Sequence, residues 1–246
     1  MSLKEVVHTL FSHSAPIIVI FGRLDSGKTD LALLLAQKML EYDMVKKVAT
    51  NIKIEDDSIF RDKFERVTSV EKLKIWLEED KRTHKLFILD ECGENIDARN
   101  PMGRINKEIR YVGFKVRKYR QKMILIIQRI KDLESTFRSD ELTLAKIKKL
   151  GKTRAIIISD LFVGRWNTDT VFLNDIPKTK INFDTYDVAP FELDEEITGG
   201  LNEPCCLVAK LYMGNSNLTI IGRQMKLAPQ EVKRLLQRHL RHTFKA

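Results

Sequence analysis

Short, mainly apolar runs alternate with amphipathic stretches over roughly the first 160 residues of the chain. The runs at residues 17–21, 85–90 and 122–128 have the length and the β-branched content of buried strands. Residues 30–42 carry apolar side chains at helical spacing, and residues 104–120 are a strongly basic helix candidate. Strands that alternate with helices in this way favour a mainly parallel α/β sheet covered on both faces.

The remaining pattern places further elements around this frame. Residues 1–14 are expected to form a short helix or arm, and residues 45–54 fit a second strand. Ser69 is a candidate N-cap for a helix that follows it. Residues 142–159 hold two β-rich segments around a Gly-Lys pair, which predict a β-hairpin at the sheet edge. Residues 161–186 give only short strands and turns without a clear place.

One defined motif lies between the first predicted strand and the helix after it. Residues 22–29 read GRLDSGKT and match the phosphate-loop pattern G-x-x-x-x-G-K-[ST] at every position. In such a loop, backbone N–H groups and a helix N-terminus point at phosphate oxygens. Lys28 is expected to reach the β- and γ-phosphates, and the Thr29 hydroxyl to ligate Mg²⁺. The predicted nucleotide-binding residues are Gly22, Asp25, Ser26, Gly27, Lys28 and Thr29. The sequence therefore predicts a site for a nucleoside triphosphate, with ATP and Mg²⁺ as the expected cofactors.

Two carboxylates end the second apolar run, in the sequence FILDE at residues 87–91. Because parallel strands end at one edge of a sheet, Asp90 and Glu91 should lie beside the phosphate loop. We assign Asp90 to Mg²⁺ through water and Glu91 to activation of the attacking water as general base. An apolar run that ends in two acids is weak evidence alone, but downstream of a complete phosphate loop it is specific.

Two further polar residues are candidates for the same chemistry. Gln128 ends the next apolar strand, where it would sense the γ-phosphate or the attacking water, or simply cap the strand. Arg138 follows ten residues later and could reach a phosphate in a neighbouring subunit, as arginine fingers do. Several other arginines lie in the same stretch, so the sequence does not single out Arg138.

Charge is distributed unevenly around a net value of +9. Residues 100–154 hold sixteen Lys or Arg against five Asp or Glu. Residues 184–203 hold seven acids and no base, and residues 201–246 hold eight bases and two acids. Two basic blocks separated by an acidic one predict two surfaces for a polyanion such as double-stranded DNA, joined by a solvated connector. An ordinary charged surface is the alternative.

Composition limits the class of protein. A chain of 246 residues that is 43% hydrophobic can bury a full core, as one large domain or as a domain with a small module. No apolar run approaches the ~20 residues that span a bilayer, and no secretory signal is present, so no integral membrane segment is expected. The three cysteines have no metal-binding spacing, which favours a reducing, cytoplasmic compartment.

The last block reads as a small helical module. We predict an ATPase core over residues 1–183, an acidic linker over 184–204 and the module over 205–246. Helical segments are expected at residues 205–213, 219–225 and 230–242, separated by the turns GNSN and KLA. They favour a helix-turn-helix or winged-helix arrangement, with a helical protein-docking bundle as the alternative. The predicted DNA-contacting residues are Arg223, Lys233, Arg234 and Arg238.

Taken together, GRLDSGKT, FILDE, the strand-end glutamine in ILIIQR and the sequence KDLESTFR resemble the FtsK/HerA superfamily of P-loop ATPases. The resemblance covers about residues 15–160, and the VATNIKI strand is similar to the smaller viral and plasmid branches, which include genome-packaging and Zot-like ATPases. It implies a P-loop NTPase core, a hexameric ring with ATP sites between subunits, and DNA in the central pore. The membrane segment of Zot-like proteins and the long extra domains of larger translocases have no counterpart in this sequence.

The expected function is an ATPase that couples Mg²⁺-dependent hydrolysis to DNA translocation or genome packaging. One alternative is a DNA-binding regulator or replication initiator that is switched by its nucleotide. A second is an ATPase for virion or pilus assembly that does not act on DNA. DNA-stimulated hydrolysis distinguishes the last from the others, and movement along duplex distinguishes a motor from a regulator.

Overall fold

The structure is a computed structural model that divides the chain into two compact units, residues 1–193 and residues 194–246. It describes residues 2–12, 17–92, 104–139, 142–163, 168–185, 191, 230, 232 and 233. The division between the units falls within the predicted acidic segment 184–204. The fold that positions the candidate site belongs to the first unit.

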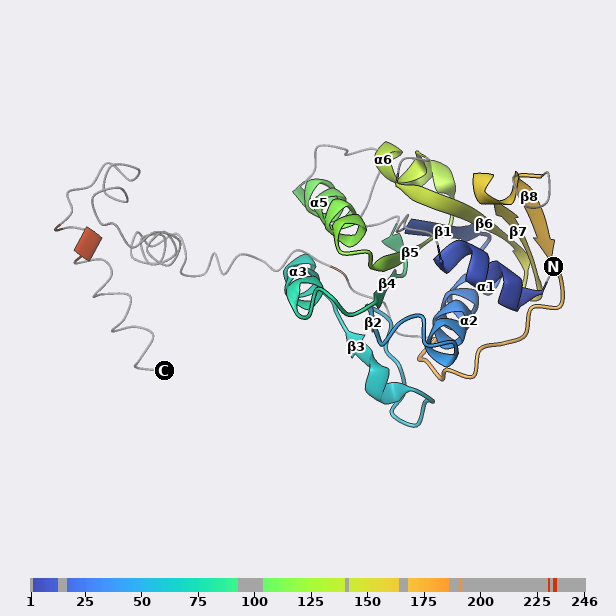
Figure 1. Cartoon of the computed structure of the whole chain (residues 1–246), viewed down its shortest axis with the longest axis horizontal. Coiled ribbons are helices and arrows are strands. Elements are labelled where there is room, and N and C mark those ends of the chain that lie inside the picture. Colours follow the sequence, from blue (N-terminus) through green and yellow to red (C-terminus); the bar gives the residue numbers. More distant parts are fainter. Residues whose placement is uncertain are drawn as a thin grey trace. The chain divides into compact units, whose positions relative to one another are not determined.

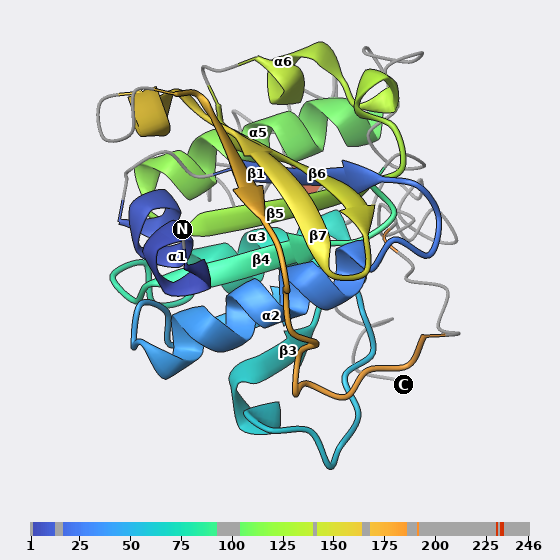
Figure 2. The same ribbon diagram turned by 90° about the vertical axis from the view of Figure 1, so that its right-hand side faces the viewer.

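The described part of the first unit contains one eight-stranded sheet with the order β3-β2-β4-β5-β1-β6-β7-β8 (Figures 1 and 2). The strands are β1 Ile17–Gly22, β2 Lys47–Thr50, β3 Phe64–Arg66, β4 Lys85–Leu89, β5 Lys122–Ile127, β6 Thr143–Gly151, β7 Arg154–Ile158 and β8 Thr170–Leu173. The six strands from β3 to β6 are parallel, and β7 and β8 continue the sheet in antiparallel pairing. The predicted mainly parallel sheet with a hairpin extension is confirmed.

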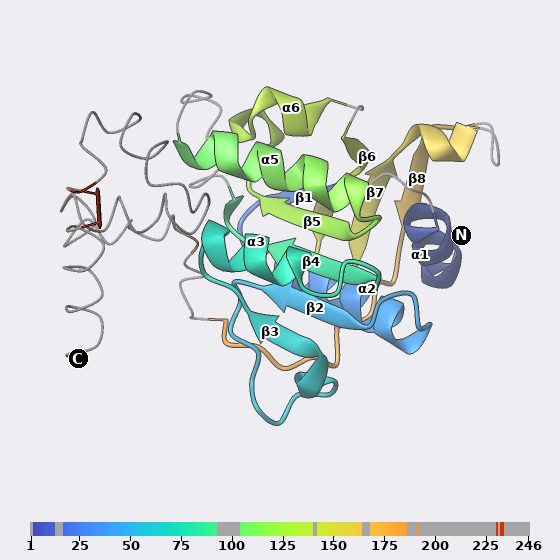
Figure 3. The same ribbon diagram turned by 60° about the vertical axis from the view of Figure 1, so that its left-hand side comes forward.

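Helices cover both faces of the parallel strands (Figure 3). The α-helices are α1 Leu3–Phe11, α2 Lys28–Glu41, α3 Val70–Glu78, α5 Arg104–Lys118 and α6 Ser135–Arg138, and short 3₁₀ turns occupy Arg61–Lys63, Ile130–Asp132 and Asp160–Phe162. The Ser69 side chain accepts a hydrogen bond from the Lys72 N–H and caps α3, as predicted. Helices α1 and α2 pack in one apolar cluster, and α3, α5 and α6 pack in the other.

The apolar runs of the strands follow from this three-layer arrangement. Successive side chains of a strand point to opposite faces of the sheet. In β1, Ile18 and Ile20 pack on the side of α1 and α2, whereas Ile17 and Val19 pack on the side of α3 and α5. A strand covered on both faces favours apolar residues at successive positions, which is why β1 reads as an apolar run and β4 and β5 do so after their first residue, a lysine.

The strand order brings three polar sequence positions to one edge. Strand β5 lies between β1 and β4, and all three run parallel. Their carboxyl ends therefore meet, so the phosphate loop after β1, Gln128 after β5 and Asp90 after β4 share one edge of the sheet.

After β8, the chain returns to this edge as an extended segment, residues 176–185, which we call the strap (orange in Figure 2). The Lys180 N–H donates to Gln37 Oε1 of α2 at 2.8 Å. Further along, the Asp184 N–H donates to the carbonyl oxygen of Lys53, just beyond β2, at 3.0 Å. The strap thus joins the antiparallel end of the sheet to the side of β2.

Lys122, the first residue of β5, provides a test of this packing. Burial lowers the pKa of Lys122 from 10.5 to about 8. Between these pH values the unfolded chain holds a proton that the folded chain has released, so the free energy of unfolding should rise with pH. We expect Lys122→Met to stabilise the protein at pH 7 by on the order of 1 kcal/mol, with the gain shrinking towards pH 10.

The measurement is denaturant unfolding of both proteins at several pH values between 7 and 10. Lys118→Met serves as the matched control, because Lys118 is exposed at the end of α5. A gain from Lys122→Met that is equal at pH 7 and pH 10 would contradict the expected linkage.

Few residues of the second unit are described. Gln230, Val232 and Lys233 are helical, with Val232 buried and Lys233 exposed. The predicted helix-turn-helix module, including Arg223, Arg234 and Arg238, otherwise lies outside the described residues.

Candidate nucleotide-binding site

The phosphate loop turns sharply between β1 and α2, and its two glycines are required by the local geometry. Gly27, the N-cap of α2, has a φ angle of 77°, a left-handed conformation that glycine adopts without steric cost. A Cβ atom on Gly22 would lie 2.7 Å from the backbone oxygen of Lys149 in the neighbouring strand β6. The loop is therefore held tightly against the β6–β7 hairpin.

Lys28 lies over this loop at the start of α2. Its Nζ donates a hydrogen bond to the carbonyl oxygen of Arg23 at 2.9 Å. Burial lowers the pKa of Lys28, and the carboxylates of Asp90, Asp25 and Glu91 oppose that effect. The ammonium group is thus placed between the loop backbone and a group of acids, where the phosphates of a nucleotide would compensate its charge.

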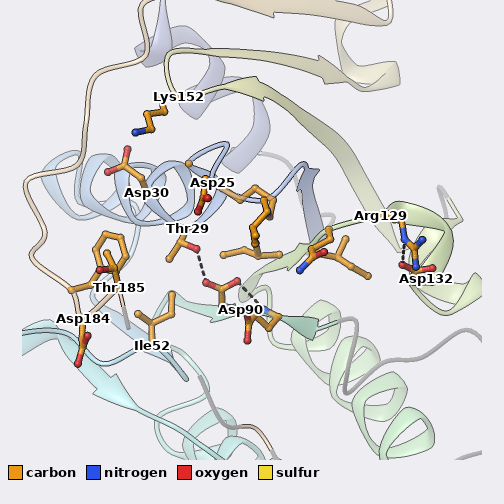
Figure 4. Close-up of a pocket in the computed structure, with 18 residues that line it drawn as sticks. Asp25, Thr29, Asp30, Ile52, Asp90, Arg129, Asp132, Lys152, Asp184 and Thr185 are labelled. Atoms are coloured by element: carbon orange, nitrogen blue, oxygen red, sulfur yellow. Dashed lines mark hydrogen bonds and ion pairs between the residues drawn. The ribbon is translucent and has the colours of Figure 1, made fainter. Parts of the chain in front are cut away.

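Thr29 and Asp90 meet although they are 61 positions apart in the sequence (Figure 4). The Thr29 hydroxyl donates to Asp90 Oδ2 at 2.6 Å. Burial raises the pKa of Asp90, while the Thr29 hydroxyl, the Glu91 N–H and the charge of Lys28 hold it down. These three groups stabilise the ionised form of the Asp90 carboxylate.

The donors at this point fit Mg²⁺. Mg²⁺ is usually bound by one or two carboxylates together with substrate phosphates and waters, rather than by a cage of protein ligands. Thr29 Oγ1 and Asp90 Oδ2 are both hard oxygen donors that line the same pocket. Among the described residues, no group of three or more His, Cys, Asp or Glu side chains could hold a metal by itself.

A pocket of about 670 Å³ opens at this edge of the sheet. Its lining includes Lys28, Thr29, Asp90, Glu91 and Gln128, five of the six residues that the sequence predicted for catalysis and metal binding. Glu91 is exposed and has a φ angle of 52°, a strained value for a residue with a side chain. The structure therefore brings the phosphate loop, both acids and the strand-end amide into one site.

This is a P-loop NTPase fold. The evidence is the loop itself, its position between β1 and α2, and the acids at the end of a parallel strand two positions away in the sheet.

The sixth residue, Arg138, is placed differently. It ends α6, is exposed, and is not part of the pocket lining of its own chain. Arg129 and Asp132 lie nearer and form an ion pair with Arg129 Nε 2.6 Å from Asp132 Oδ2 at the rim of the pocket. Of the remaining predicted loop residues, Asp25 and Gly27 line the pocket, and the Ser26 side chain is buried.

The sequence interpretation missed Asn51, which holds Asp90 in place. Its Nδ2 donates to the backbone oxygen of Asp90 at 3.1 Å, and its Oδ1 accepts from the backbone N–H of Asp90 at 2.8 Å. Asn51 is fully buried directly after β2, which pairs with β4. The prediction placed Asn51 inside a strand over residues 45–54, whereas β2 ends at Thr50, so Asn51 lies at the same edge of the sheet as the acids.

The hairpin residues Lys149 and Lys152 were also missed. Lys149 is 3% exposed, and its Nζ donates to the carbonyl oxygen of Lys152 at 2.9 Å. Burial lowers the pKa of Lys149, and the nearby Asp30 partly offsets this. Lys152 lines the pocket (Figure 4), so the β6–β7 turn adds a cation to the site.

Asn51→Ala should lower the rate of ATP turnover by about tenfold to a hundredfold, the usual effect of removing a group that orients a metal-binding residue. The substitution leaves the buried backbone N–H and oxygen of Asp90 without these partners, which costs about 1–3 kcal/mol of stability per group. Maximal turnover should also need a higher Mg²⁺ concentration than in the wild type, which a loss of stability alone would not cause. Asn174→Ala, at an exposed position after β8, is the control. An unchanged Mg²⁺ requirement in Asn51→Ala would contradict the positioning role.

Neither a protein-family model nor a curated protein sequence matches the chain. Similar solved structures include the genome-packaging NTPase B204 of Sulfolobus turreted icosahedral virus 2 in complex with AMP, with 15% identity and a TM-score of 0.49 over 67% of this chain and 100% of that one. The N-terminal domain of zonular occludens toxin from Neisseria meningitidis has 17% identity and a TM-score of 0.43 over 65% of this chain and 94% of that one.

The conjugation coupling protein TcpA of pCW3, solved with ATPγS, has 12% identity and a TM-score of 0.49 over 66% of this chain and 60% of that one.

In the part of the chain that the structure describes, none of the helices combines the length and the apolar character that crossing a membrane requires.

Proposed function

We propose that this chain binds and hydrolyses ATP with Mg²⁺. The observation that carries the proposal is the contact between Thr29 Oγ1 and Asp90 Oδ2 at 2.6 Å, which joins the phosphate loop to the acids of β4 within one pocket. Phosphoryl transfer requires this combination of a phosphate cradle, metal-binding oxygens and a group to activate water.

The residues divide the work as follows. The loop N–H groups and Lys28 hold the β- and γ-phosphates, and Thr29 and Asp90 would hold Mg²⁺, which neutralises charge on the phosphates when bound. Glu91, exposed to the pocket beside Asp90, accepts a proton from the attacking water as general base. Gln128, at the end of β5 between the loop strand and the acid strand, orients that water or contacts the γ-phosphate.

We further propose that hydrolysis drives movement or packaging of double-stranded DNA by a ring of subunits. Support comes from the resemblance of the motifs to DNA-pumping ATPases and from the two basic blocks in the sequence. Exposed bases on α5 and the hairpin, including Arg117 and Lys148, belong to the first block. The second block contains the proposed DNA-contacting residues Arg223, Lys233, Arg234 and Arg238. A nucleotide-switched DNA-binding regulator and an assembly ATPase that does not act on DNA are the competing functions.

Two measurements test this function. We expect the full chain to hydrolyse ATP in the presence of Mg²⁺, and duplex DNA to increase the rate. With ATP, the protein should also displace a bound roadblock from the duplex. Absence of any ATP hydrolysis would overturn the enzymatic proposal. Hydrolysis that DNA does not stimulate would favour the assembly ATPase, and stimulation without displacement would favour the regulator.

The exposed position of Arg138 suggests a role towards a neighbouring subunit. If Arg138 acts in trans, Arg138→Ala and Glu91→Gln chains should each be inactive alone, and mixing them should restore part of the hydrolysis in mixed rings. The measurement is ATP turnover of the mixture, compared with that of each variant alone. Failure to restore activity, with mixed assemblies confirmed by mass, would contradict the role of Arg138.

A further inference from the structure

The strap is fixed to the first helix after the phosphate loop by a set of polar contacts. Asp30 directly follows Thr29 of the phosphate loop, and its Oδ1 accepts a hydrogen bond from the Thr179 N–H at 3.3 Å. The Thr179 hydroxyl and the Lys180 N–H both donate to Gln37 Oε1, at 3.1 and 2.8 Å. Because Gln37 is buried, its side chain fixes the position of the strap along α2.

The far end of the strap is fixed to the loop that follows β2. The Asn182 N–H donates to Ser58 Oγ, and the Glu55 N–H donates to the carbonyl oxygen of Asn182, both at 3.0 Å. Phe183 forms an antiparallel bridge with Ile54. The strap backbone is therefore fixed both to α2 and to the loop after β2.

The last three residues of the strap line the pocket, together with Ile52. In Figure 4, Ile52, Asp184 and Thr185 lie on one side of Asp90, and Arg129 and Asp132 lie on the opposite side. Phe183 is half-buried and packs against the apolar cluster beneath α2. The pocket therefore has a wall with two apolar side chains, separate from the charged groups that hold phosphates.

A nucleoside has the chemistry that such a wall recognises. Its base has flat apolar faces that stack on aromatic rings, and its ribose and base edges carry hydrogen-bonding groups. The pocket volume of about 670 Å³ lies well within the range of sites that enclose whole small-molecule ligands. A triphosphate alone would make no use of Phe183 or Ile52.

We propose that the strap is the nucleoside-binding wall of the site, with Phe183 in contact with the face of the base and Thr185 facing its polar groups. This assignment rests on the proposed function and adds the residues that recognise the part of ATP that does not react. Residues 176–185 carry no sequence motif, and this assignment gives them the role of contacting the nucleoside. Gln37 is then a positioning residue, because it holds the strap and does not line the pocket.

Calorimetric titration of the full chain with Mg²⁺-ATP and with Mg²⁺-tripolyphosphate tests the assignment. Phe183→Ala should raise the dissociation constant for ATP about tenfold, the effect of losing one base-stacking contact, and leave that for tripolyphosphate unchanged. Phe183→Tyr should retain most of the ATP affinity. Gln37→Leu should likewise weaken the binding of ATP and leave the binding of tripolyphosphate unchanged.

Phe172→Ala is the matched control, because Phe172 is 61% exposed on β8 and outside the pocket. It should bind both ligands as the wild type does. Equal ATP affinity in wild type and Phe183→Ala would overturn the assignment. An equal loss of affinity for ATP and for tripolyphosphate in Phe183→Ala would also overturn it. A wild-type chain that binds tripolyphosphate and ATP with the same affinity would overturn it while leaving the phosphate site intact. Binding of neither ligand by the wild type would overturn the proposed function as well.

Discussion

Replacement of Lys28 by alanine is expected to lower ATP turnover by about a hundredfold or more. Its Nζ donates a hydrogen bond to the carbonyl oxygen of Arg23 in the loop at 2.9 Å, and three carboxylates act on its charge. When phosphates bind, that ammonium would exchange the carbonyl for phosphate oxygens, which are stronger, charge-assisted partners. Alanine removes the charge without affecting the core beneath the loop.

The measurement is steady-state hydrolysis together with ATP binding. The matched control is Lys38→Ala, ten residues further along α2 and outside the pocket, where a surface ion pair with Glu41 is lost instead. It should change turnover by less than about twofold. Wild-type turnover in Lys28→Ala would mean that the loop does not hold the reacting phosphates.

Glu91→Gln is expected to bind ATP normally and to hydrolyse it about 10²–10⁴ times more slowly. Glutamine has almost the same shape and keeps the backbone N–H that donates to Asp90 Oδ1 at 2.8 Å. It cannot accept a proton from water at neutral pH. The loss should therefore appear in the hydrolysis step and not in the affinity, which separates a general base from a binding residue.

Single-turnover hydrolysis, with ATP affinity measured separately, distinguishes these effects. Glu65→Gln, at an exposed position of β3 outside the pocket, is the control and should hydrolyse ATP at the wild-type rate. A rate for Glu91→Gln near that of the wild type would assign the base to another residue.

The parts of the fold and site that could be predicted are those encoded locally. The phosphate loop has its eight residues in succession, and the apolar run before Asp90 and Glu91 identifies a buried strand and its end. The hairpin was predicted because its two strands and its Gly-Lys turn are adjacent in the chain.

The parts that could not be predicted depend on distant partners. Asn51 is recognisable only once β2 is known to pair with β4, since its partner Asp90 lies 39 positions away. The strap could not be recognised from the sequence, because its hydrogen bonds are made to Asp30 and Gln37, which are 149 and 143 positions away. Burial of Lys149 follows from its place beside the loop, and a lysine in an alternating strand would ordinarily be expected to face water.

The central place of β1 in the sheet has a consequence for synthesis of the protein. Both hydrogen-bonding partners of β1, strands β5 and β6, follow it by about a hundred residues or more. At ordinary translation rates, this apolar strand waits about five to twenty seconds with both edges unpaired. Helix α2, translated immediately afterwards, can cover only one of its faces. The nascent chain therefore exposes an apolar strand with two unpaired edges early, and its yield in cells should depend on chaperones that bind extended apolar segments.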